Sequence, residues 1–423
     1  MKTIKYFGNE QKIYYEKLNN GLDVYIIPNH IEKTYHASIV SKYGSEISDF
    51  IPVNEKEFVH LPDGIAHFLE HKVFDTDGVD AFSFFSKTGT YTNASTTFFS
   101  TRFFINGKRC FKKNFNYLLS MVFTPYFTNE RVESERNIIA EEIKMYDDEP
   151  DWMIDYEASR AVYQNYLQKK IAGTVESISK IDANLLKKVY ETFYQPSNMF
   201  VVVSGNVTPK EVIDILNNNE ALKKIKITNQ KIEIKKKEEV SEVKKEYVGL
   251  EGNIILPKLK YVYKFLLKDF KTCQGARLRF YFDAIFNHLF GDGSLFEEVV
   301  DKKKISTFYY LENQSIFDTY MLALYAESEY ADLFKEEVDN TISNIHITKE
   351  DFARIKKVWE SIVIRSLDNA EAIANSVVLT IIKGEDIADK YQLINSLTYE
   401  ELESVIKEMD FSNKTFVLML PKE

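Results

Sequence analysis

Two histidines and a glutamate occur close together in the segment GIAHFLEHKVF, spaced as His67-x-x-Glu70-His71. Residues four apart share one face of a helix, so the imidazoles of His67 and His71 can point at one metal ion. Glu70 lies on that face as well, within reach of a water molecule beside the ion. Zinc prefers nitrogen and oxygen ligands in tetrahedral geometry, and a catalytic zinc keeps one position open. The motif therefore predicts a hydrolytic zinc site, with Glu70 as general base, that needs a third protein ligand.

Candidates for the third ligand lie farther along the chain, in VESERNIIAEEIKMYDDEP. Glu135 and Glu142 are separated by two helical turns and so share one face of the expected helix. One carboxylate can bind the metal while the other accepts the N–H of a ligand histidine and fixes its tautomer. Glu141 points about 100° away around the helix, and we expect it to face solvent.

The alternative interpretation is a pair of surface histidines on an amphipathic helix with an unrelated glutamate. The downstream glutamate pair argues against it. The remaining histidines belong to no metal-ligand spacing and are interpreted as ordinary surface or core residues: His30, His36, His60, His288 and His346.

The composition is that of a soluble globular protein, with 44% hydrophobic and 28% charged residues in a chain of 423. This length exceeds one ordinary core and predicts two domains of about 200 residues each. The net charge of −10 argues against a nucleic-acid partner, which normally leaves a basic surface on the protein.

Two cysteines, Cys110 and Cys273, match no metal-ligand spacing and are too few for a disulfide framework. We expect them to be reduced core residues of a cytosolic protein. The N-terminal segment shows no signal-peptide pattern, and no apolar run approaches the roughly 20 residues that span a bilayer. The sequence therefore predicts a cytoplasmic protein without a membrane span.

A weak internal repeat gives the best indication of architecture. Residues 177–207 read as a helix that leads into a buried strand, and residues 396–421 repeat this order. We therefore predict an α+β fold with two similar halves, each a mixed or antiparallel sheet packed with helices. The alternative is that any protein of mixed helices and strands contains such junctions.

The expected domains are residues 1–222, which carry the zinc site, and residues 248–423, a homologous domain without a metal. The charge-dense segment 223–247 is interpreted as a solvated linker, part of which, 231–234, alternates like an exposed edge strand.

Several elements are predicted around the motif. A helix over 64–74 has Asp63 as a candidate N-cap, and a helix over 130–147 has Thr128. The other expected elements are strands over 22–27, 35–42, 91–94 and 97–105, a helix over 79–87 that ends at Gly89, and in the second half the segments 261–267, 280–290, 307–312 and 319–326.

The stretch PDGIAHFLEHKVF resembles the signature of the pitrilysin/insulysin (M16) family of peptidases, the inverzincins. ERNIIAEEIKMYDDEP looks like the second metal helix of that family. By position, the resemblance implies that Glu142 is the third zinc ligand and that Glu135 supports the catalytic site. TGTYTNASTTFFSTRFF is similar to the family's edge strand, which a substrate extends, and Asn93 and Ala94 hold its substrate-binding positions.

Two further stretches, GTVESI and YQPSNMFVVVSGNV, also look like family landmarks. The likeness is greatest to short bacterial members of the processing-peptidase branch. It implies one Zn²⁺ per chain, two bowl-like halves that enclose a chamber, and hydrolysis of short unfolded peptides with broad side-chain selectivity.

One position departs from the family. Members that act alone carry, in the C-terminal half, an arginine followed seven residues later by a tyrosine that orients the substrate. Here Asp301 and Phe308 stand at those positions, or Lys302 and Tyr309 in the neighbouring frame. We therefore expect a hetero-oligomer with a homologous, metal-free subunit, although a homodimer would also supply a second chain.

Two other functions remain open at this point. A dedicated maturation peptidase would remove the leader from one precursor peptide, and a non-catalytic subunit would only support such a complex. A module with a purely structural zinc fits less well, because structural sites fill all four positions with protein ligands.

Overall fold

The computed structural model describes residues 1–7, 11–31, 33–76, 80–228, 230–387 and 389–422. Contacts divide the chain into two compact units. Unit 1 comprises Met1–Ile143, Lys169–Lys236 and Ser361–Gln392, and unit 2 comprises Lys144–Gln168, Lys237–Glu360 and Leu393–Glu423.

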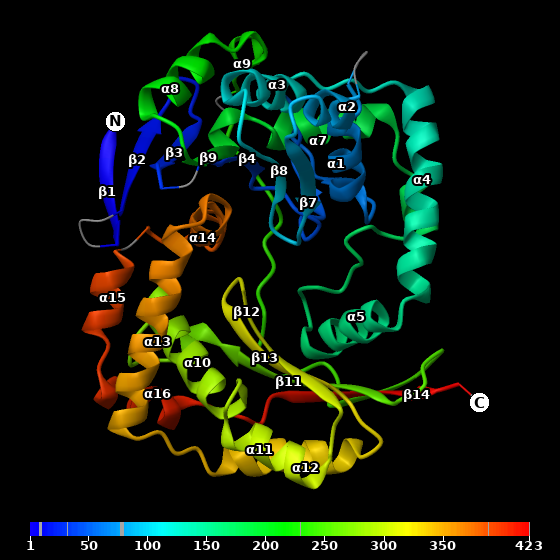
Figure 1. The fold of residues 1–423 in the computed structure, drawn as a ribbon. Helices are drawn as coiled ribbons and strands as arrows, with labels where there is room; N and C mark the ends of the chain where they lie inside the picture. Colours follow the sequence, from blue (N-terminus) through cyan, green and yellow to red (C-terminus); the bar gives the residue numbers. More distant parts are fainter. Residues whose placement is uncertain (8–10, 32, 77–79, 229, 388, 423) are drawn as a thin grey trace. The chain divides into compact units, whose positions relative to one another are not determined.

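Unit 1 is built around a seven-stranded sheet with the order β1-β2-β3-β9-β4-β8-β7 (Figure 1). The central strands β4 and β9 are buried along their whole length, because apolar, β-branched runs such as FVVV suit a strand covered on both faces. β3 and β9 are parallel, and the other neighbours are antiparallel. The bounds are β1 Lys2–Phe7, β2 Gln11–Lys17, β3 Asp23–Pro28, β4 Tyr35–Ser41, β7 Tyr91–Thr96, β8 Thr101–Gly107 and β9 Met199–Gly205, with β5 Asp49–Phe50 and β6 Val59–His60 in a separate pair.

Helices cover both faces of this sheet. α1 packs against β7 and β8, and α3 packs against β8 and β4, whereas α14 packs against β4 and β9. Thr96 contacts α1 and Asn106 contacts α14. Asn106 is paired with Tyr91 of β7, and paired residues point to the same face of the sheet. Tyr91 and Thr96 are an odd number of residues apart on one strand, so α1 and α14 cover opposite faces. The helices are α1 Ile65–Phe74, α2 Ala81–Ser86, α3 Phe111–Phe123, α4 Asn129–Asp148, α6 Val175–Ile178, α7 Ala183–Phe193, α8 Pro209–Asn218, α9 Glu220–Lys224 and α14 Ala370–Ile382, with the 3-10 turn η1 Pro196–Asn198.

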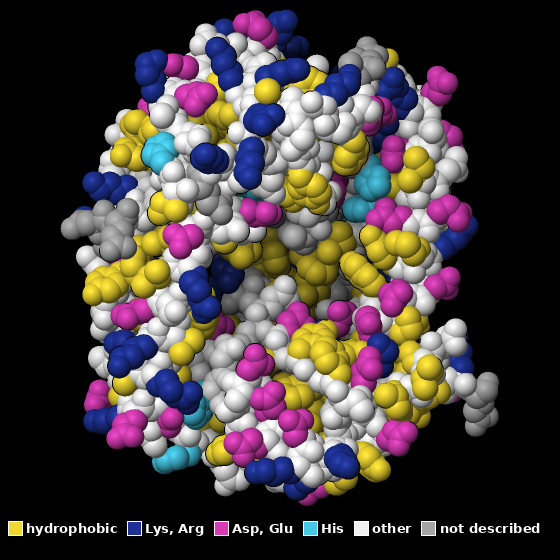
Figure 2. Space-filling view, viewed as in Figure 1, with side chains coloured by type: hydrophobic (Ala, Val, Ile, Leu, Met, Phe, Trp, Pro, Cys, Tyr) yellow, Lys and Arg dark blue, Asp and Glu magenta, His cyan; other side chains and the backbone are white. Residues whose placement is uncertain are grey.

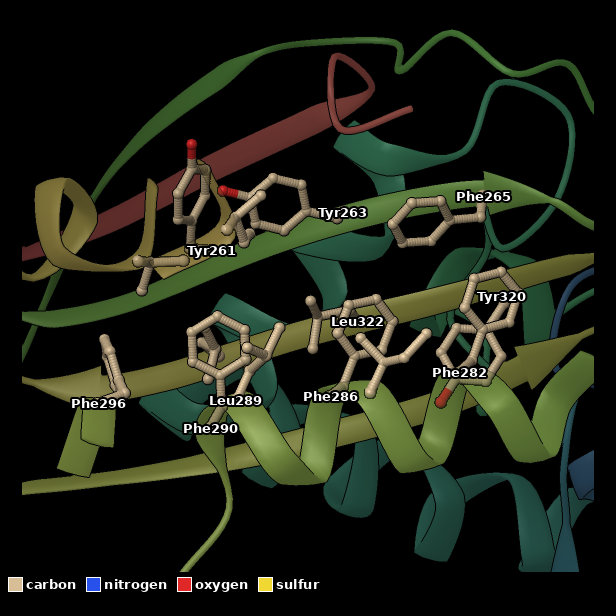
Figure 3. Packing of buried hydrophobic residues seen from close by; sticks show 14 of the residues in the cluster. Tyr261, Tyr263, Phe265, Phe282, Phe286, Leu289, Phe290, Phe296, Tyr320 and Leu322 are labelled. Atoms are coloured by element: carbon tan, nitrogen blue, oxygen red, sulfur yellow. The ribbon is translucent and has the colours of Figure 1, made fainter. Parts of the chain in front are cut away.

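Unit 2 is built around a five-stranded sheet with the order β10-β14-β11-β13-β12. Its core is aromatic: side chains of β11 and β13 interdigitate with those of α10, as Figure 3 shows for Phe265, Phe282 and Tyr320. The strands are β10 Tyr247–Gly252, β11 Lys258–Leu266, β12 Phe308–Ile316, β13 Thr319–Glu327 and β14 Lys414–Pro421. The other elements are α5 Pro150–Val162, η2 Leu267–Asp269, α10 Gly275–Phe290, α11 Leu295–Lys303, α12 Ala331–Ser343 and α16 Tyr399–Glu408. The helices α13 Lys349–Leu367 and α15 Lys390–Ser396 each cross a boundary between the two units in the sequence.

The two sheets share one topology, which confirms the predicted α+β fold with two similar halves. β9 is parallel to β3 and antiparallel to β4. In the same way β14 is parallel to β10 and antiparallel to β11. These are the strands that end the two repeats found in the sequence. The predicted domains follow this repeat, whereas the compact units follow contacts. The two differ because α5 packs on β11 and β14, while α14 packs on β4 and β9.

Some predictions about individual residues are wrong, and others are confirmed. Asp63 is not the N-cap of α1: the cap is Gly64, with φ of 91°. Thr128 does cap α4, since its hydroxyl accepts from the Arg131 backbone N–H at 3.3 Å. The start of the predicted 79–87 helix lies outside the described residues. Both cysteines are free, but Cys110 is exposed rather than buried, because it precedes α3 at the surface.

The segment 223–247 is only partly solvated. Residues beside Ile234 hydrogen-bond to β5, which accounts for the predicted edge-strand alternation. Glu239, however, is 1% exposed. Its carboxylate accepts from the backbone N–H groups of residues 164–166 and pairs with the buried Lys264 at 3.2 Å. A carboxylate can be buried here because four donors satisfy it. No helix within the described ranges has the length and apolar character that a bilayer span requires.

Candidate metal centre

Helix α1 presents the H-x-x-E-H motif on its polar side. Its opposite side is apolar and buried in the core of unit 1, through residues that include Phe68, Leu69 and Val73. This periodicity leaves His67, Glu70 and His71 on the side that faces α4 and β7. The predicted helical spacing therefore places all three side chains in one site.

The start of α1 is fixed by a close backbone contact with the segment 172–174. Gly64 and Gly173 both have positive φ, 91° and 77°. A Cβ on Gly64 would lie 2.4 Å from the Ala172 carbonyl oxygen, and one on Gly173 would lie 2.4 Å from that of Asp63. Ser177 reinforces this contact, since its hydroxyl donates to the Asp63 carbonyl at 2.7 Å. The GTVESI stretch thus positions the first turn of α1.

Helix α4 is tied to the same part of the chain. Arg136 donates through Nε to the Ile178 carbonyl at 3.2 Å and through Nη2 to the Ile181 carbonyl at 2.6 Å. These bonds fix the rotation and register of α4, on which Glu135 and Glu142 face α1. Sequence reasoning missed the role of Arg136, and only its position next to Glu135 could have drawn attention to it.

His67, His71 and Glu142 each offer a ligand atom, and these atoms lie within 4.8 Å of one another. His67 Nε2 is 3.6 Å from Glu142 Oε1, and His71 Nε2 is 3.4 Å from Glu142 Oε2. Two ligands at tetrahedral zinc distances are about 3.4 Å apart, so the donor set fits a zinc ion. Imidazoles and acidic side chains reach the surface together beside α4 (Figure 2).

The other carboxylates occupy distinct places. Glu135 Oε1 lies 2.9 Å from His71 Nδ1, the nitrogen opposite the ligand atom. Glu70 Oε2 accepts from the Thr96 hydroxyl at 2.6 Å. Glu141 is exposed, as expected. His67 Nδ1 is buried and has no hydrogen-bond partner within the described part of the chain, so Glu135 orients only one of the two imidazoles.

The pKa values of the two histidines are shifted in opposite directions. Burial and the neighbouring His71 lower the pKa of His67 to about 4, against the pull of Glu142 and Glu135. Burial also disfavours protonation of His71, but hydrogen bonds to Glu135 and Glu142 outweigh it and raise that pKa to about 9. Burial raises the pKa of Glu70 above its ordinary value, in spite of the hydrogen bond from Thr96. A carboxylate with a raised pKa is better suited to transfer protons near neutral pH.

Strand β7 brings the predicted substrate-binding residues next to this site. Within the described part of the chain it is the edge strand of the sheet, and β8 is its one neighbour. Asn93 is exposed, its Nδ2 donates to the Tyr91 hydroxyl at 3.0 Å, and its Oδ1 accepts the Ala94 backbone N–H at 2.9 Å. Thr96, which contacts Glu70, was missed by sequence reasoning, although strand alternation from Ala94 places it on the same face.

A cleft of about 750 Å³ opens beside Glu70 and His71. Its walls come from α1, α2, β7 and α4, and they combine apolar rings with charged groups. The lining residues are Glu70, His71, Phe74, Asp75, Thr76, Asp80, Phe82, Asn93, Arg131, Ser134, Glu135 and Ile138.

The positions expected for an arginine and a tyrosine lie in unit 2. Asp301 and Lys302 are exposed on α11. Phe308 is exposed on β12, whereas Tyr309 packs against the core cluster and donates its hydroxyl to the Phe290 carbonyl at 3.3 Å. Tyr309 therefore faces the core, and the neighbouring frame gives no free tyrosine hydroxyl.

Two family models match the chain. "Insulinase (Peptidase family M16)" matches residues 61–175, and "Peptidase M16 inactive domain" matches residues 180–358. The first range includes His67, Glu70, His71, Glu135 and Glu142.

Relatives and solved structures agree with these models. The chain is 33% identical over 419 residues to the zinc protease YmfH of Bacillus subtilis strain 168, covering 96% of each chain. It is 24% identical over 372 residues to the zinc protease YmxG of the same organism, covering 81% of this chain and 84% of that one. An M16-like peptidase from Alicyclobacillus acidocaldarius superposes with a TM-score of 0.89 at 27% identity, over 98% of this chain and 99% of the other. The protein belongs to the M16, or insulinase, family of peptidases.

Proposed function

We propose that the chain is a zinc-dependent endopeptidase that hydrolyses short unfolded peptides. His67, His71 and Glu142 are its zinc ligands, Glu70 is the general base and Glu135 orients His71. The observation that carries this proposal is that ligand atoms of His67, His71 and Glu142 lie within 4.8 Å of one another, with a buried carboxylate beside them. The two histidine nitrogens lie 3.6 and 3.4 Å from the two oxygens of Glu142, close to the separation of about 3.4 Å that tetrahedral zinc gives. Because three protein ligands converge among the described residues, the arrangement fits a catalytic site with one open position better than a structural one.

When bound, Zn²⁺ supplies a Lewis acid that polarises the scissile carbonyl and lowers the pKa of water. Glu70 accepts a proton from the attacking water and delivers it to the nitrogen of the leaving amine. The Thr96 hydroxyl donates to Glu70 Oε2 and so holds this carboxylate in one orientation for the transfer. Glu135 accepts from His71 Nδ1 and so directs Nε2 of that ring toward the metal.

The peptide is bound as an additional strand on the free edge of β7. Asn93 and Ala94 provide the main contacts, and the Asn93 side chain first has to release the Ala94 N–H that it holds. Recognition through backbone hydrogen bonds gives broad side-chain selectivity, and it requires an unfolded segment.

A homologous, metal-free subunit is the proposed partner, with a homodimer as the alternative. The support for it is local: neither Asp301 with Phe308 nor Lys302 with Tyr309 offers the arginine and free tyrosine hydroxyl that orient a substrate in family members acting alone. The site of action we propose is the cytoplasm.

The first test is metal content. We expect about one zinc per chain in the protein purified without chelator, and loss of that zinc in His71→Ala. Failure of the wild-type chain to take up zinc, even after reconstitution, would refute the metal site. The second test adds unstructured peptides with and without the partner subunit. A zinc-loaded chain that cleaves none of them in either condition would leave a non-catalytic subunit as the function, and cleavage of one precursor alone would favour a maturation peptidase.

A further inference from the structure

A second polar cluster lies on the sheet face opposite α1. Arg102, on β8, donates through Nε to Ser38 Oγ at 2.9 Å. Its Nη2 lies 2.7 Å from His36 Nε2. Its guanidinium carbon lies 4.8 Å from the centre of the Phe104 ring, so the charged group is stacked on an aromatic surface. The side chain is therefore held in one orientation by groups of β4 and β8.

The network defines how His36 is protonated. A guanidinium can only donate, so His36 Nε2 accepts, and Nδ1 carries the proton that it donates to Asn106 Oδ1 at 2.5 Å. Asn106 Nδ2 in turn donates to Glu371 Oε2 at 3.0 Å. Burial, together with the adjacent Arg102, lowers the pKa of His36 to about 3, so the ring stays neutral. Arg102 is thus supported directly by Ser38 and His36, and through His36 by Asn106 and Glu371.

The positive charge of Arg102 has no anionic partner of its own. None of the described carboxylates forms an ion pair with the guanidinium, and Nη1 makes no hydrogen bond to a described residue. Burial lowers the pKa of Arg102 to about 10, and the more distant Glu371 only partly offsets it. A half-buried, unpaired charge is unfavourable, whereas a charge-assisted bidentate bond to a carboxylate would satisfy it. The rigid support means that little side-chain entropy would be lost on binding.

We propose that Arg102 binds a carboxylate of the peptide, supplied either by its C-terminus or by an acidic side chain. This inference rests on the proposed function, because it places the anion on the substrate. A singly charged carboxylate suits the cluster better than a phosphate, since Glu371 would repel a second negative charge.

The register makes the contact geometrically accessible. Arg102 is paired with Ser95 of β7, on the face that also exposes Tyr91 and Asn93. A strand added to the edge of β7 would lie two strand spacings, about 10 Å, from the backbone of β8. About three residues of extended peptide cover that distance across the open face. The carboxylate would therefore come from a residue a few positions from the segment that pairs with β7.

The test uses one peptide sequence in four forms. The C-terminus is a free carboxylate or an amide, and an internal position is Glu or Gln. Both the Kd for the full-length protein and kcat/KM of the zinc-loaded enzyme are measured for each form. We expect at least one carboxylate form to bind about tenfold more tightly than the form that lacks both, as one charge-assisted bond predicts. The pair of forms that shows the preference identifies whether the carboxylate comes from the C-terminus or from an acidic side chain.

For Arg102→Gln, the Kd of the form that lacks both carboxylates and the Kd of the preferred carboxylate form should be about equal. Arg109→Gln, which removes an exposed positive charge of the same unit, should preserve it. Equal binding of all four forms by the wild-type protein would by itself overturn the inference. A preference for the carboxylate forms that survives in Arg102→Gln would also overturn it. Tighter binding of carboxylate peptides without cleavage of any form would instead contradict the proposed function alone.

Discussion

Replacement of Gly173 by alanine tests whether the backbone contact between Gly173 and Asp63 positions the metal helix. Gly173 has a φ of 77°, and an added Cβ would lie 2.4 Å from the Asp63 carbonyl oxygen. Cβ atoms essentially never approach closer than 3.0 Å, so the two segments must separate by at least 3.0 − 2.4 = 0.6 Å. His67 is in the first turn of α1 after Gly64 and would move with it. Metal–ligand distances tolerate only about 0.2 Å.

Gly89 provides the matched control. It has a φ of 64°, and no atom of the described residues lies within 4 Å of the position of its Cβ. Gly89→Ala therefore carries only the intrinsic penalty of a left-handed backbone, about 1–2 kcal/mol. Gly173→Ala carries the same penalty and the steric one in addition.

The assay combines urea unfolding with zinc titration against a competing chelator. We expect Gly89→Ala to lower the unfolding free energy by about 1 kcal/mol and to bind zinc as the wild-type protein does. Gly173→Ala should be less stable than this control and should lose at least about tenfold in zinc affinity, or 1.4 kcal/mol. Equal stability and equal zinc affinity of the two variants would refute the view that this backbone contact sets the position of His67.

Substitutions of three further carboxylates, one of them with a matched control, test the roles of these groups. Glu70→Gln should keep its zinc but reduce turnover by about 10²–10⁴-fold, because an amide cannot accept the proton; an active variant would exclude Glu70 as the base. Glu135→Gln should weaken zinc binding about 10–100-fold, whereas the exposed Glu141→Gln should not change it, and equal affinities would remove Glu135 from the site. Glu239→Gln should lower the unfolding free energy by about 3 kcal/mol at pH 7, because Lys264 is left buried and unpaired. Burial raises the pKa of Glu239, but three backbone N–H groups and Lys264 outweigh it and lower the pKa below its ordinary value. The stabilisation that Glu239 contributes is therefore present above the unfolded-state pKa and is lost as the pH falls through the folded-state pKa. The unfolding free energies of the variant and the wild-type protein, measured in urea, should therefore converge at acid pH. A constant difference between these free energies would contradict this assignment.

The parts of the structure that depend on periodicity were predictable from the sequence. His67 and His71, and later Glu135 and Glu142, follow the helical repeat, so their faces could be derived without knowledge of the fold. The buried strand that ends the first repeat, β9, follows from its apolar run FVVV in the same way, and β4 lies within the predicted range 35–42. These predictions are local, and the helical repeat or the two-residue alternation of a strand decides them.

The parts that depend on contacts distant in the sequence were not predictable. Asp63 has the residue type of an N-cap, but the close approach of Ala172 requires Gly64 in a left-handed conformation at that place. Glu239 stands in a run of charges, and its burial depends on backbone donors more than seventy residues away, at 164–166. Amphipathic patterns show which side of a helix is apolar but not which sheet covers it.

The repeated topology shows which elements of the second half correspond to those that carry the candidate metal site. In element order, α10 and α13 of the second half correspond to α1 and α4 of the first, because each pair is placed in the same way between equivalent strands. Helix α1 carries the half-buried His67 and His71, whereas α10 carries Phe282 and Phe286, which are buried in an aromatic core. The sheet is therefore a shared scaffold, and the proposed chemistry depends on a few side chains of two helices. Since substitution of those side chains leaves the sheets and their connections intact, a metal-free subunit can retain the same fold, and such a subunit is the partner that we propose.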